Sequence, residues 1–195
     1  NLIGVAICLS VKRSYYIPLA HKDEDGKIIE EQIDFKEALK QLNNILSNSS
    51  LIKIGHNIKY DIAVLKRYKI DVVSFEDTML MSYINDAGNH RHGMDELAKV
   101  HFNRDTIKFK DVVGTGKSQI TFDYVEIEKA IEYAAEDAEI TFKLYLLLKK
   151  KLSEEKNISA YNYLEKPLVA SILEMEINGI KINTEYLQSL SSEFE

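Results

Sequence analysis

A long helical pattern from Ile127 to Leu152 constrains the fold more than any other stretch of the sequence. Its apolar and charged residues each recur near the 3.6-residue period of an α-helix, so that they separate onto different faces. One apolar stripe consists of Ile127, Ile131, Ala134, Ala138, Phe142 and Tyr145, a second strip of Tyr133, Ile140, Leu144 and Leu148, and a solvent face of Glu128, Glu132, Glu136, Glu139, Lys143 and Lys150. The pattern predicts one long amphipathic helix packed against a core.

Asp137 interrupts the second apolar strip, one helical turn after Tyr133. A carboxylate among apolar side chains must be ion-paired, neutral or bound to a metal. Tyr133 at position i−4 lies beside it on the helix surface. The helix alone leaves two interpretations open: an aspartate at the edge of the packed face that pairs with a lysine elsewhere, or a functional carboxylate.

Composition excludes several classes of protein. The chain has 195 residues, of which 45% are hydrophobic and 29% charged, which is typical of a folded domain, with room for part of a second. The longest apolar run, Ile3 to Leu9, is too short to span a membrane. A net charge of −6 argues against coating duplex DNA, although it permits an enzyme that grips a few nucleotides through metal ions. The single cysteine, Cys8, favours a reducing cytoplasm and a small buried side chain.

A strand, a polar turn and a helix follow one another from Leu51 to Tyr68. The brief strand Leu51 to Ile54 leads into the sequence GHNIKYD, which ends at Asp61. Asn57 and Asp61 stand four residues apart, so both side chains can reach the space above the strand end, where α/β proteins place chemistry. The structural alternative is that Asn57 caps the helix and Asp61 complements its dipole.

The remaining segments alternate between strand and helix patterns. Strands are predicted at Leu2 to Leu9, Ser14 to Leu19 and Asp71 to Phe75, with a strand-like Ile180 to Ile182; helices are predicted at Phe35 to Leu46, Ile62 to Tyr68, Met79 to Asn85, Met94 to His101 and Tyr161 to Asn178, with a last one that begins after Asn183 or Thr184.

Two loops carry residues that could form binding sites. His90 and His92 lie between Asp86 and Gly93 and could ligate a metal, but no further Cys or His follows at helical spacing, which favours a polar loop. The sequence DVVGTGKS ends like a phosphate-binding loop. Asp111 stands where the motif requires its first glycine, so a flexible surface loop is predicted instead.

Several segments together resemble one family. Gly55 to Asp61 resembles a second exonuclease motif, and Tyr133 to Asp137 (YAAED) resembles the Tyr-x-x-x-Asp third motif. The connecting segments RHGMDEL and GTGKSQITF and the stretch from Glu165 to Asn183 also match in order and spacing. The chain therefore resembles the proofreading 3′–5′ exonuclease domain of family A bacterial DNA polymerases, in the tyrosine-containing branch of the DEDD exonucleases.

The resemblance implies an α/β, RNase H-like fold, in which a mixed five-stranded sheet is flanked by helices and acids converge on two divalent metal ions, Mg²⁺ or Mn²⁺. Asp137 would ligate the first metal, Asp61 would support the second, and Tyr133 would orient the attacking water. Residues implied near the 3′ strand are Asn57, Tyr60, Arg91 and Phe109.

One motif of the family is not found in the sequence. Its Asp-x-Glu pair on the first, central strand should lie just before Asn1, and no Asp-x-Glu occurs from Asn1 to Lys40. The chain also begins without methionine and directly in a strand pattern. We therefore expect residues 1–155 to form an N-terminally truncated exonuclease domain, and residues 156–195 to begin a helical polymerase domain.

Three functions compete at this point. The resemblance favours a module that removes mispaired nucleotides from the 3′ end of single-stranded or frayed DNA. It implies that the module is covalently linked to a polymerase domain. It also implies a cytoplasmic monomer that does not bind membranes. A non-catalytic scaffold of the same fold would lose the later acids as well, whereas Asp61, Tyr133 and Asp137 are kept. An RNase D-like enzyme that trims RNA is disfavoured by the polymerase-like segment from Pro167 to Asn183.

Overall fold

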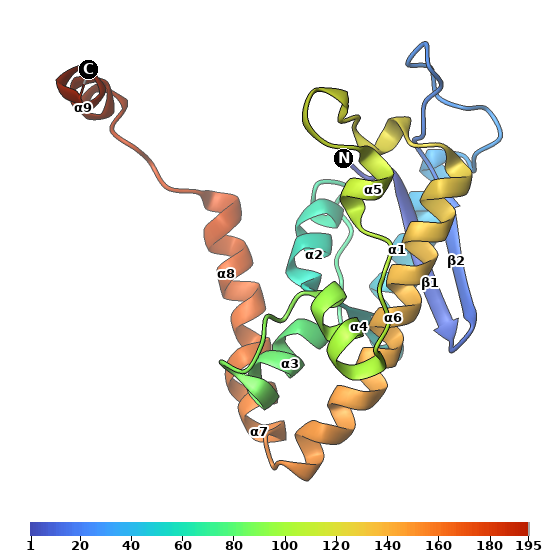
Figure 1. Cartoon of the computed structure of the whole chain (residues 1–195), viewed down its shortest axis with the longest axis vertical. Coiled ribbons are helices and arrows are strands. Elements are labelled where there is room, and N and C mark those ends of the chain that lie inside the picture. Colours follow the sequence, from blue (N-terminus) through green and yellow to red (C-terminus); the bar gives the residue numbers. More distant parts are fainter. Residues whose placement is uncertain (195) are drawn as a thin grey trace.

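The computed structural model describes residues 1–194. Two small sheets lie against a set of helices, of which the longest, α6 (Ile127–Glu154), runs along the domain (Figure 1). The predicted α/β class is thereby confirmed. Within the described residues, no helix combines the length and apolar character that a membrane crossing requires.

The N-terminal hairpin forms as the sequence predicts. Strands β1 (Gly4–Ser10) and β2 (Arg13–Pro18) pair antiparallel, with Gly4 opposite Pro18, and a turn in which Lys12 adopts a left-handed φ of 72° joins them. The hairpin packs on α1 (Phe35–Leu46), whose bounds match the prediction. The shared core cluster consists of Leu19, Ala38, Leu42 and Ile70.

The second sheet is a β–α–β unit. Strands β3 (Lys53–Gly55) and β4 (Phe75–Asp77) are parallel, and α2 (Ile58–Lys66) lies between them in the sequence. The fourth strand starts later than the predicted Asp71, because Ser74 takes a left-handed φ of 54° that extended pairing does not allow.

The five-stranded sheet of the sequence-based expectation is not formed by residues 1–194, where β1 pairs only with β2 and β3 only with β4. Helix α6 contacts β1, β2 and β3, so one helix covers both pairs. Each strand keeps one edge without a strand partner within the described part of the chain.

Helix α6 is buried mainly along its second strip. Ile140, Leu144 and Leu148 of this strip are fully buried, whereas in the first stripe Ala134 is buried but Ile131 is 40% exposed. Ala130 and Leu152 are buried as well. The reason is that α3 and α4 pack on α6 around Ile140 and Leu144, and the helical period alone cannot tell which apolar strip meets them.

The other helices extend the fold toward the C-terminus. Helix α8 packs on α2 through Val169 and Leu173, whereas α9 contains no buried residue and lies apart from the rest (Figure 1). The predicted strand-like segment at residues 180–182 is irregular, so that expectation was wrong. The remaining bounds are α3 (Thr78–Asp86), α4 (Met94–Phe102), α5 (Phe109–Val113), η1 (Gly116–Ser118), η2 (Phe122–Tyr124), α7 (Ile158–Ala160), the π-helical turn η3 (Tyr161–Glu165), α8 (Lys166–Asn178) and α9 (Thr184–Phe194).

Candidate active site

The turn that joins β3 to α2 brings the strand end unusually close to the helix. A Cβ atom on Gly55 would lie 2.7 Å from Cγ1 of Ile58, so only glycine fits there without a shift of the helix. Asn57 then adopts a left-handed conformation with φ 57°, and its side chain makes no capping hydrogen bond. The structural alternative that Asn57 caps the helix is therefore wrong.

Asp77, at the end of β4, supplies the cap instead. Its Oδ1 accepts a hydrogen bond from the backbone N–H of Asn57 at 3.1 Å, and its Oδ2 accepts one from Ile58 at 2.9 Å. The side chain is 2% exposed and also caps α3 through Met79 and Leu80. Asp77 therefore caps two helices, α2 and α3. Because Asp77 satisfies the first donors of α2, the side chain of Asn57 remains available for another partner.

Asp61 lies in the first turn of α2 and is exposed. Desolvation by neighbouring protein atoms, with a smaller contribution from the negative charge of Asp77, raises the pKa of Asp61 to about 6. A carboxylate that only complemented a helix dipole would have a lowered pKa. Tyr60, one residue earlier, is 68% exposed.

Asp137 is a partly buried carboxylate without an ion-pair partner in the described part of the chain. Its Oδ1 is shielded from solvent and accepts no hydrogen bond. Burial raises the pKa of Asp137 to about 7; the Tyr133 hydroxyl opposes this rise, and the charges of Asp95 and Glu136 add to it. The alternative of a salt bridge to a lysine is therefore wrong for residues 1–194.

An aromatic cluster surrounds the hydroxyl-bearing side chain next to Asp137. Tyr133 lies 6.0 Å, between ring centroids, from both Phe109 and Phe122, and these two phenylalanines stack on each other at an interplanar angle of 20°. Desolvation and the adjacent Asp137 raise the pKa of Tyr133 above its ordinary value, so the phenol stays protonated at neutral pH. Phe109 remains 49% exposed and can still present a ring face to a ligand.

Glu136 holds the segment that leads into this cluster. It accepts hydrogen bonds from the guanidinium of Arg104 at 2.5 Å and from the backbone N–H of Ile107 at 2.7 Å. The sequence pattern placed Glu136 on the solvent face of the helix, but its side chain is only 11% exposed. Through these two bonds Glu136 fixes the approach of the chain to Phe109.

The predicted site residues fall into separate groups in the structure. Phe109, Tyr133 and Asp137 lie together, whereas Asn57, Tyr60 and Asp61 lie on the turn and first residues of α2. Arg91 is exposed in the loop between α3 and α4. Residues 1–194 contain one group of three or more His, Cys, Asp or Glu close enough to share a cation, and neither Asp61 nor Asp137 belongs to it.

The unpaired carboxylate yields a stability prediction for the metal-free protein. A carboxyl group with a raised pKa in the folded state binds more protons than it does unfolded, so its charged form destabilises the fold above pH 7. We expect Asp137→Asn to raise the free energy of unfolding at pH 8 by on the order of 2 kcal/mol, and this gain to shrink as the pH falls toward 4. Urea unfolding in EDTA at several pH values measures it. A loss of stability at pH 8 would contradict the description of an unpaired carboxylate.

Comparison with known proteins identifies the family of the chain. A family model described as a 3′–5′ exonuclease matches residues 2–153. The DNA polymerase I of Rhizobium leguminosarum is 42% identical over 186 residues, covering 93% of this chain and 18% of that protein. The DNA polymerase I of Pseudomonas aeruginosa is 35% identical over 198 residues, covering 99% of this chain and 21% of that protein. The chain thus spans about a fifth of the length of these relatives.

Solved structures show the same fold. Pol1 of M. smegmatis, in a complex with DNA primer-template and dNTP, has a TM-score of 0.62 at 20% identity and covers 93% of this chain and 28% of that one. The Brucella melitensis protein NrnC has a TM-score of 0.60 at 19% identity, with 90% and 83% coverage.

The fold, together with the family match over residues 2–153, defines a 3′–5′ exonuclease domain. The chain belongs to the 3′–5′ exonuclease family whose domains occur in bacterial DNA polymerase I.

Proposed function

We propose that this domain hydrolyses the 3′-terminal nucleotides of single-stranded or frayed DNA and so serves proofreading. The observation that carries the proposal is the carboxylate of Asp137, whose shielded Oδ1 accepts no hydrogen bond in the described part of the chain and which lies one turn after a protonated tyrosine. Buried carboxylates without partners concentrate at functional sites, because the fold retains them at a cost in stability.

The donor atoms fit divalent metals of the hard type. Asp137 would hold the first ion, and Asp61 would support the second, largely through water. Both offer only carboxylate oxygens, which suit Mg²⁺ or Mn²⁺. Such a pair of ions supplies charge stabilisation for the attacking and leaving oxygens of a phosphodiester. The raised pKa values of Asp61 and Asp137, about 6 and about 7, support a site that releases protons when a cation binds.

The remaining groups would bind and orient the reactants. The phenol of Tyr133 keeps its proton at neutral pH and can hold the attacking water by a hydrogen bond. The exposed rings of Phe109 and Tyr60 offer stacking surfaces for the terminal bases. Asn57, whose side chain is not used in capping, and the exposed Arg91 can contact the sugar and phosphates of the same strand. Few phosphate contacts are needed, which is compatible with a net charge of −6.

The open strand edges support a larger sheet. β1 and β3 each lack a partner on one side within residues 1–194, and α6 contacts both. Unpaired edges in a covered sheet are costly, because their N–H and C=O groups go unsatisfied. We propose that a further strand lies between β1 and β3, completes the five-stranded RNase H-like sheet and carries the Asp-x-Glu acids.

The same proposal extends to the organisation of the protein. Residues 1–155 would be the exonuclease domain and residues 156–195 the start of a helical polymerase domain. The lack of buried residues in α9 is compatible with packing against a part of the protein beyond these residues. We propose a cytoplasmic monomer in which the polymerase domain is the covalently linked partner.

Digestion of labelled oligonucleotides tests this function. The sample is the extended polypeptide, meaning this chain together with an upstream strand that carries Asp-x-Glu. We expect 5′-labelled single-stranded DNA to shorten stepwise from its 3′ end in Mg²⁺ and to stay intact in EDTA, with a blunt duplex cut more slowly. Faster digestion of RNA would favour the RNase D-like function. No digestion of either substrate, in a folded protein, would favour the non-catalytic scaffold.

A further inference from the structure

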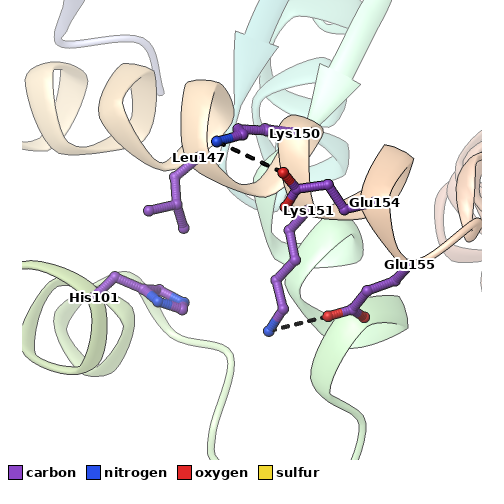
Figure 2. Close-up of a pocket in the computed structure, with 6 residues that line it drawn as sticks. All are labelled: His101, Leu147, Lys150, Lys151, Glu154 and Glu155. Carbon is purple, nitrogen blue, oxygen red and sulfur yellow. Dashed lines mark ion pairs between the residues drawn. The ribbon is translucent and has the colours of Figure 1, made fainter.

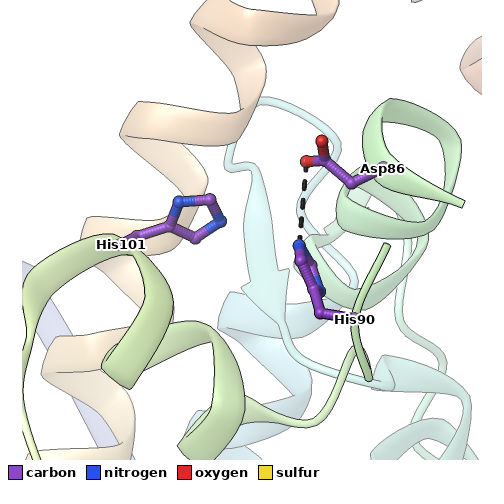
Figure 3. Close-up of side chains that lie close together, drawn as sticks. All are labelled: Asp86, His90 and His101. Carbon is purple, nitrogen blue, oxygen red and sulfur yellow. Dashed lines mark ion pairs between the residues drawn. The ribbon is translucent and has the colours of Figure 1, made fainter. Parts of the chain in front are cut away.

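Three potential metal ligands converge at the far end of α3 and α4. Asp86 ends α3, His90 lies in the loop that follows, and His101 lies near the end of α4. Their ligand atoms all lie within 4.8 Å of one another, and the side chains point toward a common space (Figure 3). The sequence pattern suggested His90 and His92 as a pair and gave no third ligand. In the fold, Asp86 and His101 lie close to His90 instead.

The hydrogen bonding of His90 leaves its lone pair facing this space. Nδ1 lies 2.8 Å from the backbone carbonyl of Arg91, and a carbonyl can only accept, so Nδ1 carries the proton. In the neutral ring Nε2 is then a bare acceptor, 4.0 Å from Oδ2 of Asp86. Two acceptors facing each other repel unless a cation or a proton lies between them. A histidine whose second nitrogen donates to a carbonyl is also the usual form of a metal ligand.

His101 adds a second unsatisfied nitrogen. Its Nε2 is shielded from solvent and has no hydrogen-bond partner in the described part of the chain. Burial lowers the pKa of His101, which keeps the imidazole neutral and able to ligate at pH 7. The side chains of Asp86 and His90 are each only 14% exposed, so both are largely shielded from solvent.

We propose that Asp86, His90 and His101 form a binding site for a Zn²⁺-type transition-metal ion. Two imidazoles and one carboxylate are a set that zinc accepts, and nitrogen ligands distinguish this site from the all-oxygen pair Asp61 and Asp137. Side-chain rotations must draw each ligand inward by less than about 1 Å to reach bonds of about 2.0–2.2 Å.

The ammonium group of Lys151 pairs with the carboxylate of Asp86 and would compete with a metal ion for it. Its Nζ lies 2.7 Å from both oxygens of Asp86, so a bound cation must share the carboxylate or displace the ammonium group. Lys151 also faces Glu155 at 3.8 Å, which can receive it when it moves. Lys151 and Glu155 line a cavity of about 410 Å³ together with His101 (Figure 2). The cavity offers an entry path on the His101 side and room for water as a fourth ligand.

A metal held here would join α3, α4 and the loop between them. The loop carries Arg91, so fixing His90 would also fix the residue next to it. Metal binding at this site should therefore stabilise the fold and order the loop.

Titration of the chelator-treated protein with Co²⁺ and with Zn²⁺ tests the proposal. We expect one Co²⁺ per chain with the visible absorption of a tetrahedral or five-coordinate complex, displaced by Zn²⁺, and a rise in Tm on binding. His90→Gln and His101→Gln should each weaken Zn²⁺ binding at least about tenfold. His92→Gln is the matched control, because His92 bonds to Ser82 at 2.9 Å and lies outside the ligand set. Its affinity should match that of the unchanged protein.

Lys151→Met separates a real site from incidental contact. Removing the competing ammonium should strengthen Zn²⁺ binding several-fold, while Asp137→Asn should leave it unchanged. The proposal is overturned if no saturable binding occurs, if His92→Gln weakens binding as much as His101→Gln, or if Lys151→Met lowers the affinity.

Discussion

Asp137→Asn should lower the Mg²⁺-dependent removal of 3′ nucleotides by the extended polypeptide by about 10³-fold or more, a loss at the upper end of what removal of one transition-state-stabilising group costs. The amide keeps the size of the side chain but cannot supply the charge that holds a cation. The physical basis is the buried, partnerless Oδ1 with a pKa near 7. Single-turnover digestion of labelled single-stranded DNA measures the rate.

This variant is expected to gain stability in EDTA while it loses activity, which a merely misfolded protein cannot do. Tyr133→Phe is the matched comparison on the same helix face. It should lower the rate only about tenfold and leave Mn²⁺ affinity unchanged, since it removes one hydrogen bond to the attacking water and no metal ligand. Full activity of Asp137→Asn would exclude the carboxylate as a metal ligand. Equal losses in the two variants would indicate that Tyr133 is structural.

The local elements were predictable because their signals lie within a few residues of each other. The amphipathic period of α1 gives its bounds, Phe35 to Leu46, and the period of α6 gives nearly the whole helix. The position of the Asp137 carboxylate among apolar side chains was also predictable, because it follows from helical spacing alone. By contrast, α5 (Phe109–Val113) is too short to show a period and was missed.

Contacts between distant segments were not predictable from periodicity. Asp77 caps α2 through Asn57 and Ile58, which are 20 and 19 residues away in the sequence. No residue near Asn57 indicates this contact. The meeting of Asp86 with His101 depends on how α3 and α4 pack on α6. The exposure of Ile131 and the burial of Glu136 likewise follow from which elements cover α6. The packing of distant segments determines which of these side chains are buried, whereas a short window of sequence only restricts which helix faces can be buried.

The number of carboxylates determines how strongly the chain binds divalent metal ions. Within residues 1–194, Asp61 and Asp137 are not joined by a third acid close enough to share an ion. Each shows a raised pKa, so cation binding must also displace protons near neutral pH. Binding by two such groups is weak, and two ions need more negative charge than two carboxylates provide.

A polypeptide of Asn1 to Glu195 alone should therefore bind Mn²⁺ weakly at Asp61 and Asp137 and show no nuclease activity above background, whereas the extended polypeptide should bind two ions and digest DNA. Calorimetric titration with Mn²⁺ compares the two, and both carry His101→Gln so that Asp86 and His90 do not add to the signal. A pH series should show the affinity falling as the pH drops from 8 to 5, because Asp137 takes up a proton near pH 7 and Asp61 near pH 6. Tight binding of two ions with stepwise 3′ shortening by the shorter polypeptide would show that the acids of a further strand are not required.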